Sequence, residues 1–80
     1  MIQVTVGNNL KREKVLVNPN STLRQVLEDA EVDYSRGVLN LDGSPIEAGG
    51  LNRTFAELGY DGSEGRDKCF LLNVVKADNA

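Results

Sequence analysis

Cys69 is the residue of this chain with the widest chemical range, because a thiol can form a thioester, a mixed disulfide or a metal–thiolate bond. Each of these functions needs partner groups, and the sequence contains no histidine and no second cysteine to act as a general base or a further ligand. Arg66 and Lys68 lie close in sequence and are expected to lower the thiol pKa. We interpret Cys69 as a structural residue of a strand, in a reducing compartment.

The carboxylates of residues 28–33 and 61–67 are the other candidates for chemistry. A calcium-binding EF-hand loop needs oxygen ligands at alternating positions, a central glycine and a closing glutamate, and neither segment has that spacing. We interpret both as solvated surfaces. A chain of 80 residues also has little room for a pocket. We therefore expect no catalytic residue, no metal and no cofactor, and predict that the protein is not an enzyme.

Two glycine-rich segments resemble functional loops only in composition. Cleavage after Gly49-Gly50 would expose a diglycine, but it would also remove the last predicted strand and half of the core. Residues 59–65 have the glycine content of a phosphate-binding loop without its Gly-Lys-Ser sequence or its strand–loop–helix context. The Gly49-Gly50 pair is predicted to be a flexible loop.

Composition and charge argue against several classes of partner. The formal net charge is −3, the basic residues are scattered, and only two Tyr and two Phe are present, whereas nucleic-acid binding favours a basic footprint with aromatic platforms. No apolar stretch is long enough to cross a bilayer. We expect no nucleic-acid partner and no membrane insertion, and we predict a cytoplasmic location.

Residues 2–6 alternate apolar and polar with the period of a strand, which places Ile2, Val4 and Val6 on one face. Residues 7–9 tolerate a reversal of the chain. The chain should return as a second strand through residues 14–17, with Val15 and Val17 facing inward and Leu16 facing outward.

A helix is predicted after Pro19, with Ser21 as its N-cap and Asn20 as the alternative. It should end near Glu31. Its apolar stripe, which repeats at helical spacing, consists of Leu23, Val26, Leu27 and Ala30.

Three shorter elements complete the chain. A strand is predicted at residues 38–41, and the turn sequence Asp42-Gly43-Ser44-Pro45 leads into a short strand around Ile46. A helical turn at residues 51–60 should be capped by Gly59. In the last strand, residues 68–76, we expect Phe70, Leu72 and Val74 to face the core.

The chain resembles the ubiquitin-like (β-grasp) family over residues 1–76. The resemblance is carried by Val17-Asn18-Pro19 followed by Thr22 and Val26, by residues 39–43, by Arg53-Thr54-Phe55 and by residues 70–72. It implies an α+β fold, in which a mixed four- to five-stranded sheet packs on one α-helix and the first and last strands run parallel at its centre. Residues 77–80 would then form a short polar C-terminal tail.

The chain departs from the family at two places. Members that conjugate or carry sulfur use a terminal diglycine, and here the last residues are Ala77-Asp78-Asn79-Ala80, which predicts a non-conjugating protein. Asn40 and Asn73 also take the positions of two branched apolar residues on the family's binding face. Amides there would leave polar groups unpaired in an apolar receptor pocket, so we do not expect binding to ubiquitin receptors.

The resulting hypothesis is a non-conjugating interaction module that docks noncovalently on an unidentified protein partner, of the kind associated with bacterial secretion systems or mobile elements. One alternative is a relative of the sulfur carriers or modifiers that has lost its diglycine. A second is a structural or inhibitory subunit that associates through a sheet edge. The candidate binding face contains Leu16, Asn40, Leu71, Asn73 and Val75.

Overall fold

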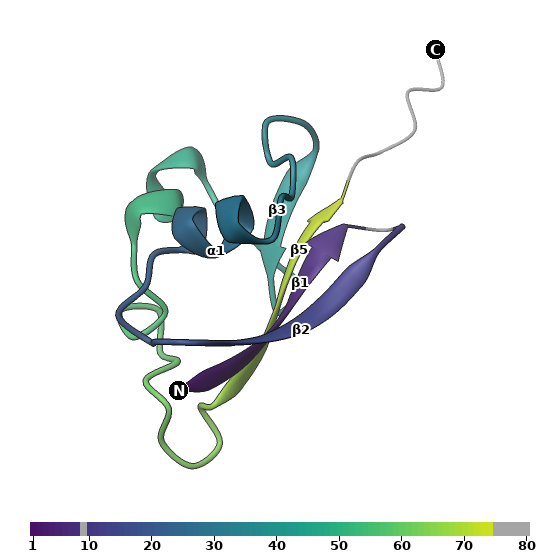
Figure 1. Cartoon of the computed structure of the whole chain (residues 1–80). Coiled ribbons are helices and arrows are strands. Elements are labelled where there is room, and N and C mark those ends of the chain that lie inside the picture. The colour runs from purple at the N-terminus through teal and green to yellow at the C-terminus, as the bar shows by residue number, and fades with distance from the viewer. Residues whose placement is uncertain (9, 75–80) are drawn as a thin grey trace.

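The computed structural model describes residues 1–8 and 10–74, which form an α+β structure with one mixed sheet (Figure 1). The sheet has five strands in the order β2-β1-β5-β3-β4, and β1 and β5 are parallel neighbours while the other pairs are antiparallel. The predicted parallel pairing of the first and last strands is confirmed. The elements are β1 (Ile2–Asn8), β2 (Arg12–Val17), α1 (Leu23–Asp29), β3 (Val38–Leu41), β4 (Ser44–Pro45), the 3₁₀ helix η1 (Ala48–Asn52) and β5 (Lys68–Val74).

The first hairpin follows the predicted alternation but is longer than expected. Ile2, Val4 and Val6 are buried, and Val15 and Val17 of β2 pack against them at the margin of the core. Gly7 and Asn8 belong to β1 rather than to the turn. A side chain at Gly7 would collide with the Lys11 carbonyl oxygen, so the close approach of β2 requires glycine there.

Helix α1 begins one residue later than predicted. Thr22, not Ser21 or Asn20, is the N-cap: its hydroxyl accepts the Gln25 N–H at 3.2 Å, and the Gln25 side-chain oxygen accepts the Thr22 N–H at 3.2 Å. This reciprocal pair is a capping box. The Ser21 backbone instead accepts the Phe55 N–H at 3.3 Å. The helix ends at Asp29 with Ala30 as its C-cap, just before the predicted end.

The predicted bounds of the third strand are confirmed, and Leu39 and Leu41 are buried. Asp42 and Gly43 have φ values of 51° and 85°, the conformation of a tight hairpin turn. Strand β4 therefore starts at Ser44 and ends just before Ile46, whose N–H donates to the Leu39 carbonyl at 2.8 Å.

The predicted helical turn at residues 51–60 is split into two pieces. Gly49-Gly50 lies inside η1, so the prediction of a flexible loop at this pair is wrong. Gly59 has a φ of 103°, and its N–H and that of Tyr60 donate to Ala56 and Phe55 at 3.1 and 2.8 Å. This is a Schellman arrangement, which confirms Gly59 as a capping residue. Phe55 is fully buried.

The predicted facing of β5 is wrong. Cys69, Leu71 and Asn73 point into the core and are buried, whereas Phe70 is 51 % exposed. The register explains the inversion, because Val4 lies opposite Cys69 and Val6 opposite Leu71 on the face that α1 covers. Leucines stand on both sides of this strand, so their pattern alone does not define its buried face.

The cap assignment predicts that Thr22→Ala lowers the free energy of unfolding by about 1 kcal/mol, because the Gln25 N–H loses its acceptor. The matched control, Ser21→Ala, should change it by less than about 0.5 kcal/mol. Urea unfolding followed by circular dichroism measures both. A larger loss at Ser21 would contradict the assignment.

The facing of β5 predicts unequal effects at two adjacent residues. Leu71→Ala should cost about 2–5 kcal/mol or abolish the cooperative transition, because it opens a cavity in the core. Phe70→Ala should cost no more than about 1 kcal/mol, since its side chain is half exposed. The urea midpoints of the two variants measure these costs. A larger loss for Phe70→Ala than for Leu71→Ala would show that Phe70, and not Leu71, faces the core.

Candidate functional site

The sheet has a covered face and an outer face. Helix α1 lies against one side of the sheet (Figure 1), where Val4, Val6 and Leu71 are buried. Because successive strand residues point to opposite sides, the residues between them point away from the helix. The cross-strand register assigns to this outer face Gln3, Thr5, Gly7, Arg12, Lys14, Leu16, Val38, Asn40, Pro45, Lys68, Phe70, Leu72 and Val74.

Two of the five predicted site residues lie on the outer face. Leu16 is 69 % exposed, and Asn40 is half-buried with its amide donating to the Val38 carbonyl at 3.1 Å. Leu71 and Asn73 are on the opposite face, buried in the core, so their predicted exposure is wrong. Val75 lies outside the described residues.

Asn73 is buried for a specific reason. Its side-chain N–H groups donate to the backbone carbonyls of Asp33 and Arg36 at 3.1 and 2.7 Å, and these bonds compensate for removing the amide from water. The side-chain oxygen has no partner within the described part of the chain. The Asn73 amide is buried and cannot enter a receptor pocket. Asn73 therefore gives no reason to expect weak binding to ubiquitin receptors.

An apolar cluster of Val38, Phe70, Leu72 and Val74 occupies the outer face where β3 meets β5. Val38 lies opposite Val74, and Leu72 lies opposite Asn40. Phe70 and Val38 are 51 % and 42 % exposed. Sequence reasoning missed this cluster, although Lys68 shares the strand face of Phe70 and a lysine favours the wet side.

Asp42 anchors the edge of this face. Its backbone N–H donates to the Phe70 carbonyl at 2.9 Å, and one carboxylate oxygen accepts the Phe70 N–H at 2.8 Å. The other oxygen accepts the Tyr60 hydroxyl. That hydrogen bond, with partial desolvation, raises the pKa of Tyr60 to about 12. One side chain thus ties the β3–β4 turn to β5 and to the 55–60 segment.

Cys69 faces the core, and burial, with the charge of Asp42, raises the pKa of its thiol to about 12. The expectation that Arg66 and Lys68 lower this pKa is wrong, because loss of hydration raises it and the charge that acts on the thiol is the carboxylate of Asp42. The thiol is protonated at neutral pH and is a weak nucleophile.

Two of the carboxylates singled out in the sequence accept hydrogen bonds within local turns. Asp33 and Asp61 accept hydrogen bonds from the hydroxyl and backbone N–H of Ser35 and Ser63, which lower the pKa of each carboxyl. Within residues 1–8 and 10–74, no three His, Cys, Asp or Glu residues converge as metal ligands. None of the helices described there has the length and apolar character needed to span a bilayer.

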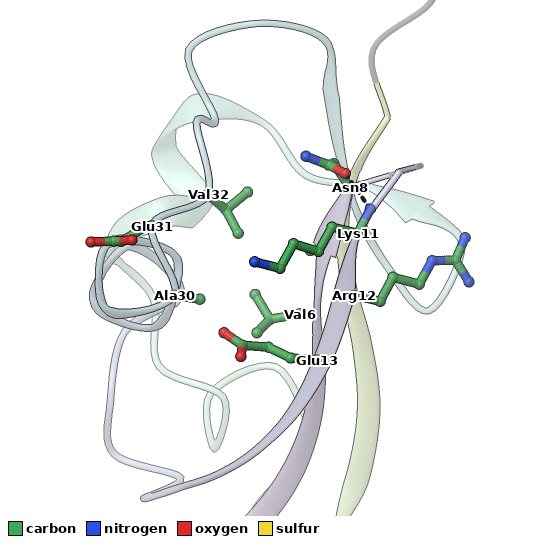
Figure 2. Close-up of a pocket in the computed structure, with 9 residues that line it drawn as sticks. Val6, Asn8, Lys11, Arg12, Glu13, Ala30, Glu31 and Val32 are labelled. Atoms are coloured by element: carbon green, nitrogen blue, oxygen red, sulfur yellow. Dashed lines mark hydrogen bonds between the residues drawn. The ribbon is translucent and has the colours of Figure 1, made fainter.

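A cavity of about 120 Å³ lies between the first hairpin and the end of α1. Figure 2 shows the Lys11 ammonium pointing toward the helix above Val6, whereas Arg12 and Glu31 point away. The Glu13 carboxylate also points toward the helix in Figure 2, so cations and carboxylates are mixed around this space.

Comparisons with family models, with curated proteins and with solved structures found no match to this chain. Function must therefore be argued from the geometry of the site.

The raised pKa of Tyr60 predicts a loss of stability in alkali. The folded state holds the phenolic proton more tightly than the unfolded chain, whose pKa is near 10, so this stabilisation is complete below pH 10 and is lost as the pH rises toward 12. Tyr60→Phe removes it. Urea midpoints between pH 8 and 11.5 should fall more steeply for the parent than for Tyr60→Phe.

The variant retains Cys69 and Tyr34, whose raised pKa values act in the same direction in both proteins. The difference between the two curves therefore isolates Tyr60. Parallel curves would show that the Tyr60–Asp42 hydrogen bond contributes nothing to stability.

Proposed function

We propose that this protein is a non-conjugating, ubiquitin-like interaction module with a β-grasp fold, which docks noncovalently on a protein partner through its outer sheet face. The mixed five-stranded sheet, its central parallel pair and the single helix on one side support this proposal, because the family resemblance implies that arrangement.

The exposure of Phe70 carries the proposal. An aromatic side chain in the interior of β5 is 51 % exposed, with Leu72 two residues further on the same face. Burying the exposed half of such a side chain at an interface contributes about 0.8–1.5 kcal/mol, half the value for a whole side chain, and exposed apolar residues that adjoin one another mark binding surfaces more often than isolated ones do.

The position of Phe70 is held before any partner arrives. Its backbone N–H and carbonyl both bond to Asp42, and it lies opposite Thr5 in the parallel ladder. A preformed surface loses less conformational entropy on binding. The buried Cys69 thiol offers no accessible group for a covalent attachment at this face.

A tagged copy of the full chain, expressed in its native host, tests the proposal. The tag belongs at the N-terminus, where Met1 is exposed. Partners should co-purify under native conditions and be absent after a denaturing wash. Phe70→Ala should weaken the affinity for the recovered partner about four- to tenfold.

Leu10→Ala is the matched control. Leu10 is 92 % exposed but belongs to the turn between β1 and β2 and not to the strands that carry the apolar cluster, so its replacement should leave capture unchanged. A ladder that survives the denaturing wash would mean covalent attachment and would refute the noncovalent mechanism. Equal losses for both variants would refute the assignment of the outer face.

A further inference from the structure

Charge is distributed unevenly between the outer face and the rest of the molecule. The chain has a formal net charge of −3, yet the outward positions of the described strands hold Arg12, Lys14 and Lys68 and no carboxylate. Glu13 of β2 lies opposite the buried Val6 and so belongs to the other side of the sheet, and Asp42, which follows β3, is already bonded to Phe70 and Tyr60. The outer face is therefore basic and apolar on an acidic protein.

The two lysines of this face flank a hollow beside Phe70. Lys14 lies opposite Thr5 on one side of β1, and Lys68 lies opposite Gln3 on the other. These four side chains and Phe70 line an open hollow of about 150 Å³. Strands β2 and β5 are two spacings of about 4.8 Å apart, so both long side chains can reach an anionic group above β1.

We propose that the outer face binds an acidic protein segment, whose apolar side chains cover the apolar cluster while a carboxylate is held between Lys14 and Lys68. This inference rests on the proposed function and names the chemistry of the partner. A carboxylate between two ammonium groups accepts charge-assisted hydrogen bonds. Complementary charge at the rim of an apolar contact speeds association and rejects partners of the wrong sign.

A second copy of the chain does not fit face to face. Two outer faces brought together would oppose cations with cations, and like charges across an interface are unfavourable. The acidic surface of α1 in a second copy could instead meet the outer face. Such self-association would raise the mass in solution as the protein concentration increases, whereas binding of a different protein would not.

The test is a titration of the ¹⁵N-labelled full chain with two blocked peptides, acetyl-Leu-Glu-Leu-Glu-Leu-amide and the same peptide with glutamine in place of glutamate. The acidic peptide at millimolar concentration should shift the amide signals of Thr5, Lys14, Lys68 and Phe70. The glutamine peptide should bind about tenfold more weakly or not at all. Raising the salt concentration from 50 to 500 mM should weaken the binding of the acidic peptide.

Charge variants make the test specific. Lys14→Gln and Lys68→Gln should each reduce affinity for the acidic peptide at least threefold and leave that for the glutamine peptide unchanged. Lys11→Gln is the matched control, because Lys11 points toward α1 in Figure 2 and not onto the outer face. It removes the same charge and should have no effect.

Several results would overturn the inference. These are equal affinity for both peptides, no shift with either, equal losses in all three lysine variants, or a mass that doubles with protein concentration. Failure of the proposed function is a separate outcome, recognised when Phe70→Ala leaves capture of the cellular partner intact. If binding of the cellular partner requires Phe70 but tolerates both lysine replacements and high salt, docking through the outer face is supported and its preference for an acidic segment is refuted.

Discussion

The parallel pairing of β1 with β5 is the constraint on which the rest of the structure depends. It joins strands from the two ends of the chain and separates β2 from β3, so the connection between β2 and β3 must cross over one side of the sheet. Helix α1 makes that crossing and covers Val4, Val6 and Leu71. The same pairing leaves the opposite face uncovered, and a candidate binding surface follows directly from the topology.

Two polar side chains hold the remaining segments against this central pair. Asn73 donates from β5 to the loop that follows α1, and Asp42 joins the β3–β4 turn to Phe70 and Tyr60. Each connects segments that are distant in sequence. Apolar contacts alone would allow these segments to shift in register relative to each other. Asn73 is buried, and because a buried polar group costs free energy unless it is bonded, its contacts select one register of β5 over its neighbours.

The outer face owes its properties to that register. With Leu71 inward, Lys68 and Phe70 must point outward together, and pairing with β1 brings them near Lys14 across Thr5. A shift of one residue in β5 would bury the aromatic ring and expose Asn73. The register of β5 therefore turns the apolar cluster and Lys68 outward, and the pairing of β1 with β2 adds Lys14 and Arg12 to the same face.

Local patterns in the sequence determined the first hairpin, the apolar stripe of α1, the bounds of β3 and the capping by Gly59, because each depends on neighbours within a few residues. The helix cap was displaced by one residue, since Ser21 and Thr22 are chemically equivalent until the backbone of Ser21 bonds to Phe55. Only the tertiary structure decided the facing of β5, and with it the candidate site. Apolar residues occupy both sides of that strand, and the choice between them rests on contacts with β1 and with the loop carbonyls bound by Asn73, which no local pattern contains.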